Sequence, residues 1–240
     1  MAKENNLKDL LTDVADAIRE KKGTTELINP QDFGKEIREI EADGVVELAE
    51  EMVDNTGNGI TIINNIIVKK GVTKIAPKAY ANTAIQTIQL PEGLETIGNA
   101  SFNSCTGLTS VEIPNSVTSI DNRAFMACSN LIQVNLPPKL TTLSGESFQT
   151  CDISVPLIIP SGIITIGTRA FYANAKIPYF DFRNHVFIPA LTNENAFSST
   201  GSARFIVPDS LYDDWIKETN WVTYAERIVK ASEFVEPANE

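Results

Sequence analysis

The sequence contains few of the residue types on which catalytic and metal sites depend. It has one histidine and three cysteines in 240 residues, and no pair of cysteines has the C-x-x-C spacing of a zinc site. A Gly-Lys-Ser/Thr phosphate loop is missing, and no apolar run reaches the roughly 18–20 residues of a membrane span. We therefore expect no enzyme activity, no cofactor, no metal and no membrane insertion.

Basic residues are also scarce relative to acidic ones. The chain has 20 Lys and Arg against 31 Asp and Glu, and its formal net charge is −11. A chain of this charge repels phosphate backbones, so we expect no nucleic-acid partner. The N-terminus passes directly into amphipathic sequence where a secretory leader would have an apolar block, which predicts synthesis in the cytoplasm without export by that route.

A repeat with a constant period of 23 residues is the dominant feature of the sequence. Prolines occur at positions 91, 114, 137 and 160, and phenylalanines at 102, 125, 148 and 171. Within one repeat, Val111 and Ile113 alternate with Ser110 and Glu112, as in a short strand with one buried face. Val117 and Ile120 form a second apolar pair. Because a single repeat cannot bury both pairs, we expect the repeats to stack as rungs of a mainly β solenoid.

The repeat pattern LxxLxLPxxLxxIxxxAFxxC resembles that of the BspA-type leucine-rich repeat family. This resemblance implies a leucine-rich-repeat solenoid over residues 60–207. We expect the solenoid to bind another molecule or to project from the structure that carries it, without catalytic activity. Residues 208–240 resemble the closing segment of such arrays, and Leu211, Trp215 and Ile216 share one face of an expected helical cap. We place an N-terminal helical segment at residues 1–42 and a linker at residues 43–59.

The N-terminal segment is amphipathic and too small to form a core of its own. Its apolar residues follow helical spacing in two stretches, so we expect them to anchor the chain to other proteins or to a second copy. These residues are Leu7, Leu10, Leu11, Val14 and Ile18, followed by Phe33 and Ile37.

This segment resembles the N-terminal module of fibre and tail proteins of tailed bacteriophages that infect gut bacteria. The resemblance implies a structural or binding protein of a virion, as a head or tail fibre or decoration subunit made in the host cytoplasm. Its expected partners are other virion proteins, further copies of the chain, and a host-surface protein or glycan. The alternative is a BspA-like adhesin on the bacterial cell surface, and the missing leader argues against it.

The cysteines, the histidine and one serine have simple structural interpretations. Cys105, Cys128 and Cys151 recur at the same interval as the prolines, so we expect a column of buried, reduced packing residues rather than a metal site or a disulfide. His185 has no nucleophile motif beside it and is expected on the surface or in a loop. Ser147 occupies a repeat position that elsewhere holds alanine.

The outward strand positions are the candidate binding residues. They form two columns across the stacked strands, and the contrasting interpretation is a solvated polar face. Pro156, Ile158 and Tyr179 are less polar than the other members of the columns, and we expect them to be exposed close to Phe187. A contiguous exposed apolar area usually marks an interface. The columns are Thr87, Ser110, Gln133, Pro156 and Tyr179, and Gln89, Glu112, Asn135, Ile158 and Asp181.

Overall fold

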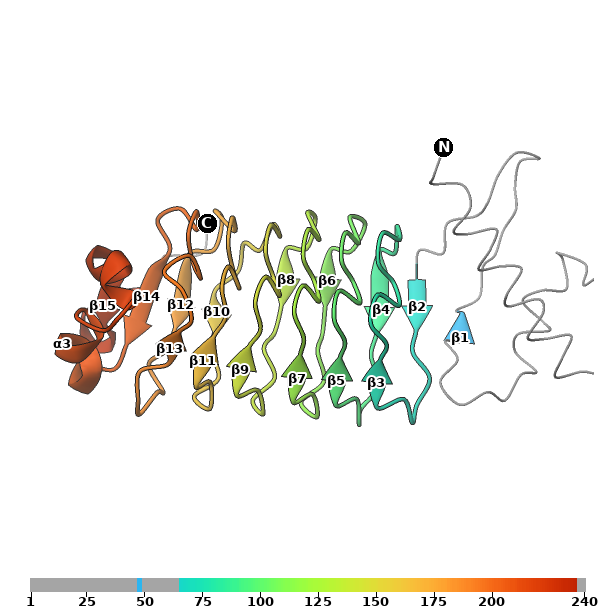
Figure 1. The fold of residues 1–240 in the computed structure, drawn as a ribbon, viewed down its shortest axis with the longest axis horizontal. Coiled ribbons are helices and arrows are strands. Elements are labelled where there is room, and N and C mark those ends of the chain that lie inside the picture. Colours follow the sequence, from blue (N-terminus) through green and yellow to red (C-terminus); the bar gives the residue numbers. More distant parts are fainter. Residues whose placement is uncertain (1–46, 49–64, 237–240) are drawn as a thin grey trace, which may run out of the picture.

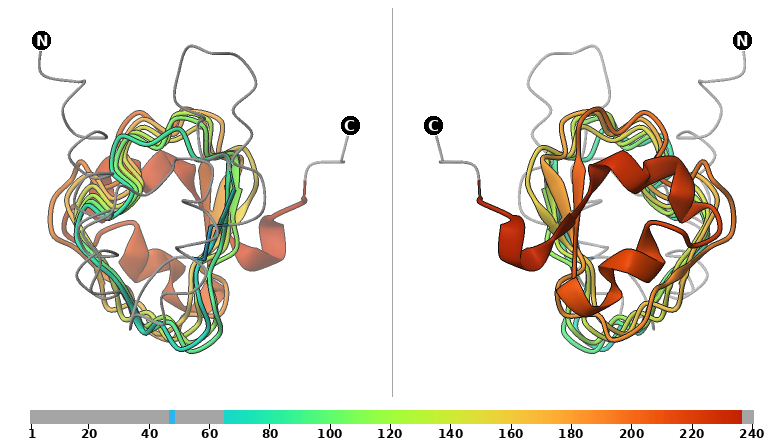
Figure 2. Two further views of the ribbon diagram at one scale, coloured as in Figure 1. Left: turned by 90° about the vertical axis from the view of Figure 1, so that its right-hand side faces the viewer. Right: turned by 90° about the vertical axis from the view of Figure 1, so that its left-hand side faces the viewer.

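The computed structural model describes residues 47–48 and 65–236, and these form an elongated stack of rungs (Figure 1). Viewed along the stack, successive rungs superpose and the C-terminal segment lies across one end (Figure 2). The predicted solenoid is therefore confirmed. The N-terminal helices expected within residues 1–42, with the anchoring residues Leu7 to Ile37, lie outside the described residues, as does most of the linker.

One column of strands follows the predicted strand positions. Neighbouring strands are parallel, and their register preserves the repeat, since Ser110 pairs with Gln133, its equivalent in the next rung. An antiparallel strand, β1 (Glu47–Leu48), pairs with the first member of this column. The column consists of β2 (Asn65–Ile67), β4 (Thr87–Gln89), β6 (Ser110–Val111), β8 (Gln133–Val134), β10 (Leu157–Ile158), β12 (Tyr179–Asp181) and β14 (Arg204–Val207).

The second apolar pair of each rung also forms a strand, so each rung has two strand sides. These strands are parallel to one another, and Ile97, Ile120 and Leu143 point from successive strands into the core. The column consists of β3 (Lys74–Ile75), β5 (Thr96–Ile97), β7 (Ser119–Ile120), β9 (Thr142–Leu143), β11 (Thr165–Ile166) and β13 (Ala190–Leu191).

Turns form the third side of each rung and are also joined from rung to rung. The Phe125 N–H donates to the Ser147 carbonyl at 2.8 Å, and the Ala127 N–H donates to the Gln149 carbonyl at 2.8 Å. Ala127 has a left-handed backbone with φ of 58° although it is not glycine, a conformation that costs an L-residue about 1 kcal/mol or more. The hydrogen bonds between rungs hold the chain in that conformation.

Stacked aromatic rings fill the core beside the turns. The rings of Phe102, Phe125, Phe148 and Phe171 lie 5.0 to 5.5 Å apart and within 7° of parallel. Each ring is fully buried. The shared period of the sequence thus places one identical side chain above the next, and rings at this separation gain stacking energy beyond burial.

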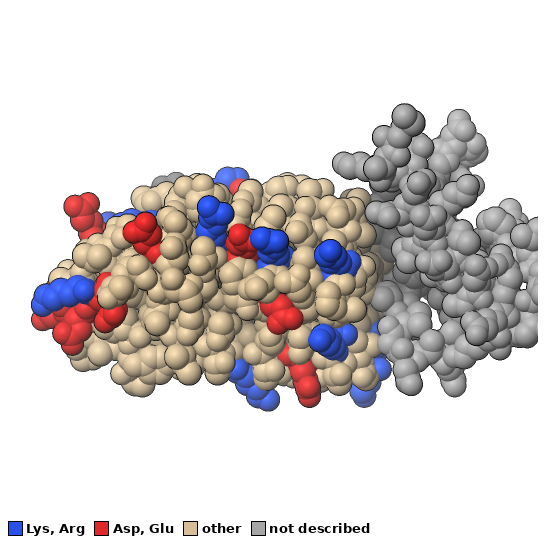
Figure 3. Space-filling model, viewed as in Figure 1, with Lys and Arg blue, Asp and Glu red and all other residues tan. Residues whose placement is uncertain are grey.

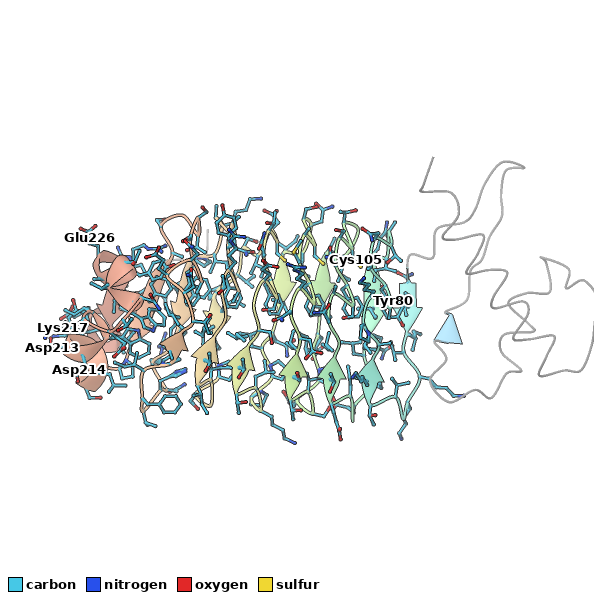
Figure 4. The ribbon with its side chains drawn as sticks, viewed as in Figure 1. Tyr80, Cys105, Asp213, Asp214, Lys217 and Glu226 are labelled. Atoms are coloured by element: carbon cyan, nitrogen blue, oxygen red, sulfur yellow. The ribbon has the colours of Figure 1, made fainter. Side chains whose placement is uncertain are left out.

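The predicted column of buried cysteines is present. Cys105, Cys128 and Cys151 are buried and free. Each thiol donates to the carbonyl of the aromatic residue in the preceding rung, at 3.0 to 3.2 Å, beginning with Cys105 and Tyr80 near the N-terminal end (Figure 4). Burial raises the pKa of Cys151 to about 12, so this thiol is protonated at neutral pH.

The C-terminal segment closes the end of the stack. It consists of η1 (Asp209–Leu211), α3 (Tyr212–Trp215), η2 (Trp221–Arg227), β15 (Ile228–Lys230) and η3 (Ala231–Glu233). Trp215 and Trp221 are fully buried against the last rungs. The expectation of a helical cap was only partly correct, because the cap also contains β15, which adds a parallel strand to the open edge of β14.

Polar side chains of this cap form the hydrogen bonds that the backbone of a further rung would otherwise form with the last one. The Trp221 indole N–H donates to the Pro189 carbonyl at 2.7 Å. The Tyr224 hydroxyl accepts from the Phe197 N–H at 3.1 Å and donates to the Glu194 carbonyl. The outer side of the cap carries charged residues, among them Asp213, Asp214, Lys217 and Glu226 (Figure 4). The cap thus satisfies the polar edge that an open solenoid would present.

Candidate functional site

A groove lies on the outward face of the first strand column, over β6, β8 and β10. It encloses about 820 Å³ and is lined by six of the predicted binding residues together with residues of the connections that follow the strands. We call it the strand-face groove. The six predicted residues are Ser110, Glu112, Gln133, Asn135, Pro156 and Ile158.

An interrupted hydrogen-bond ladder underlies the groove. β8 pairs with β6, and β10 pairs with β12, so the two pairs belong to separate sheets. Pro156 stands directly before β10 and has no N–H to donate toward a neighbouring strand. The Ser154 N–H donates to the Ile132 carbonyl at 3.1 Å just before this point. The proline therefore coincides with a break in the ladder beneath the floor of the groove.

The groove changes from polar to apolar across its strands. Glu112 follows β6 and is the one charged residue among the described residues that line it. On β10, Ile158 is 65% exposed beside the exposed Pro156. A ligand that covers this isoleucine is stabilised in the complex by about 25 cal/mol for each Å² of apolar surface removed from water.

Asn135 is in the groove but is already engaged. Its side-chain amide donates to the Ile113 carbonyl at 2.7 Å, and its amide oxygen accepts from the Ile113 N–H at 2.7 Å. The side chain therefore pairs with the backbone of the preceding rung. These two hydrogen bonds position the chain that follows β6. Gln133 is also exposed, and its side chain is available to a ligand.

The last strands of the predicted face are covered, which corrects the expectation that Tyr179 and Asp181 are exposed. Both residues are buried, and the ring of Phe234 packs edge-on against Tyr179 at 4.8 Å between centroids. Asp181 accepts from the Arg183 guanidinium at 2.9 Å, and Glu236 lies 3.5 Å from the same guanidinium. Residues 234–236 thus end the open face at β12.

The remaining predicted residues lie outside the groove. Thr87 and Gln89 are exposed on β4, and Phe187 is 37% exposed in the connection between β12 and β13. His185, expected on the surface or in a loop, lies in that connecting loop but is only 3% exposed, with its ring next to Phe182 and Trp215. Burial beneath the cap lowers its pKa.

Sequence reasoning missed the residues of the connections. Asn115, Pro138, Val155 and Pro160 line the groove although they lie outside the alternating strand positions. Prolines 114, 137 and 160 belong to the repeat column that ends each strand, so this column was the available signal for where the chain turns beside the groove.

Elsewhere the described surface carries scattered charges. The face shown in Figure 3 has isolated charges of both signs along the solenoid and a cluster at the capped end. Within residues 65–236, His, Cys, Asp and Glu side chains form no group of three that could hold a metal. None of the described helices has the length and apolar composition needed to cross a bilayer.

Comparison with known proteins supports the repeat. Among solved structures, the chain resembles a leucine-rich repeat protein from Bacteroides ovatus, with 23% identity and a TM-score of 0.53 over 60% of this chain and 37% of that one. It also resembles the pneumococcal vaccine antigen PcpA, with 17% identity and a TM-score of 0.52 over 70% of this chain and 40% of that one. At these identities the likeness shows the fold alone, and the chain spans less than half the length of either protein.

The sequence comparisons reach the same result for the repeats. No curated protein matches the chain. The family described as "BspA type Leucine rich repeat region" matches residues 58–178 and 107–213 with six copies. The match begins after the N-terminal segment, so it does not bear on the likeness of that segment to bacteriophage proteins. The chain belongs to the BspA-type leucine-rich repeat family.

Proposed function

We propose that the protein is a non-enzymatic binding protein displayed on a bacterial cell surface, a BspA-like adhesin, and that it binds a macromolecule through the strand-face groove. The observation that carries the proposal is Ile158, a large apolar residue on β10 that is 65% exposed in the strand-face groove. Membership of the BspA-type family supports display at a surface.

The stacked architecture suits this role. The ring column and the backbone hydrogen bonds between rungs hold the strands in place, so the groove needs little ordering when a ligand binds. The groove also combines an apolar surface with polar groups at its margin, which is the composition of binding sites for larger ligands.

Binding is tested with two matched variants of the full chain. Ile158→Asp places a carboxylate in the groove, and Ile164→Asp places one on the other strand side of the same rung, where the isoleucine is 58% exposed. We expect labelled protein with Ile158→Asp to bind host cells at least about tenfold more weakly, and Ile164→Asp to bind as the unaltered protein does. Equal binding by all three proteins would contradict the assignment of the groove.

Display is tested separately with an antibody against the solenoid. Bacteria that make the protein are stained intact and after permeabilisation. Equal staining supports a surface protein, and staining only after permeabilisation contradicts it.

A bacteriophage virion protein is the second candidate. The observation in its favour is the amphipathic spacing of Leu7, Leu10, Leu11, Val14 and Ile18, which implies burial against a partner. A mass-spectrometric inventory of purified virions tests this candidate directly. Deletion of residues 1–42 should then leave a folded solenoid that no longer assembles.

A further inference from the structure

The groove presents a carboxylate and an apolar surface in one outward column, two rungs apart. Glu112 is exposed after β6 and forms no ion pair with any cation of residues 65–236. Ile158 is exposed on β10 beside Pro156. Between them, Asn135 is held against the backbone of Ile113. A ligand that lies across the strands from β6 to β10 therefore contacts the Glu112 carboxylate at one end and the apolar surface of Ile158 and Pro156 at the other.

The separation of these two surfaces restricts the shape of the ligand. Neighbouring strands are about 4.8 Å apart, so two rungs separate Glu112 from Ile158 by about 10 Å. The phenylalanine rings of the same rungs, from Phe125 through Phe148 to Phe171, are spaced 5.3 and 5.5 Å and agree with this value.

Among regular peptide conformations, polyproline II has the matching period. It has three residues per turn and rises about 3.1 Å per residue, so residues three apart share a face at about 9.3 Å. In a β-strand, residues on one face are about 6.7 Å or 13 Å apart, and neither distance matches two rungs. A polyproline II segment also leaves its backbone carbonyls free, and the exposed amide of Gln133 lies in the groove to donate to them.

We propose that the strand-face groove, if it is the binding site of the proposed function, takes a polyproline II segment of a partner protein with a basic residue three positions from an apolar one. The basic side chain pairs with the Glu112 carboxylate, and the apolar side chain covers Ile158 and Pro156. Tyr179 and Phe234 close the face beyond β10, so contact on that side ends with the apolar residue.

The test uses labelled peptides and the full chain, with affinity measured by fluorescence anisotropy. The first peptide contains a lysine, two prolines and a leucine in that order, with proline on both flanks. The second lacks one of the central prolines, and the third has glutamate in place of the lysine. We expect the first peptide to bind at least about tenfold more tightly than either of the others, because the others lose the ion pair or its spacing.

Charge reversal then ties the preference to one residue. Glu112→Lys should invert the preference between the lysine and glutamate peptides, while Glu95→Lys, an exposed position near β5 outside the groove, should leave it unchanged. Equal affinity for the two spacings, or the same effect from both variants, would overturn the proposal.

If no peptide binds while Ile158→Asp still abolishes binding to host cells, the peptide proposal is wrong and the proposed function stands, with a glycan or a folded surface as the ligand. If Ile158→Asp leaves host-cell binding unaltered, the proposed function fails first.

Discussion

Removal of one hydroxyl group from the cap should measurably weaken the end of the solenoid. In Tyr224→Phe, the aromatic ring keeps its packing against Phe205, whose centroid lies 5.4 Å away. The Phe197 N–H and the Glu194 carbonyl both lose their partner. A buried backbone group without a partner costs about 1–3 kcal/mol, and the Glu194 carbonyl is partly exposed, so we expect a loss of about 2–4 kcal/mol in the free energy of unfolding.

Tyr212→Phe is the matched control for this variant. Its ring is half-buried in the cap and is covered by the Lys230 ammonium at 5.0 Å. Urea unfolding followed through the two cap tryptophans measures the free energy, and hydrogen exchange measures the Phe197 amide directly. A loss of about 2 kcal/mol corresponds to roughly 30-fold faster exchange. A difference between the two variants of less than about 0.5 kcal/mol would refute the argument that the hydroxyl replaces a missing rung.

Three further predictions concern the interior of the stack and its junction with the cap. Phe148→Ala interrupts the ring column and should cost about 3–5 kcal/mol, measured by urea unfolding. Asn135→Ala removes both hydrogen bonds to the backbone of Ile113 and should cost about 1–3 kcal/mol, with faster exchange of the Ile113 amide. Burial lowers the pKa of His185, and its Nε2 has no hydrogen-bond partner within the described structure. The unfolded chain therefore takes up this proton first, so its contribution to stability is complete above pH about 6.5 and is lost as the pH falls below that value toward the folded-state pKa. Thermal unfolding from pH 8 to 5 should show this loss in the unaltered protein and a smaller one in His185→Gln.

Local sequence was sufficient for the repeat and for the direction of most side chains. The constant period and the alternation around Val111 depend on two properties of the chain, the two-residue period of a strand and the burial of apolar groups. Both act within one rung, so Ser110 and Glu112 were correctly expected to face outward, and the cysteine column was correctly expected to be buried. The exposed pair Pro156 and Ile158 was predictable for the same reason.

The tertiary structure decided which outward residues are accessible. Tyr179 has the outward position of its column, but Phe234, from beyond the cap helices, covers it. Asn135 was expected to be an outward binding residue, and it is exposed, but its amide is paired with the backbone of the preceding rung. Neither outcome follows from alternation within one strand, because Tyr179 is covered by a segment distant in sequence and Asn135 is paired with the backbone of the neighbouring rung.

The same distinction explains the groove and the buried histidine. Proline at position 156 is visible in the sequence, but the break in the ladder depends on the strand that lies beside it. His185 is enclosed because the cap, which follows the last rung in the chain, places Trp215 against it. The sequence by itself determined the periodic scaffold, since period and polarity are local properties. Accessibility, the shape of the groove and the environment of each titratable group were decided only when distant segments packed together, because they depend on what each side chain contacts.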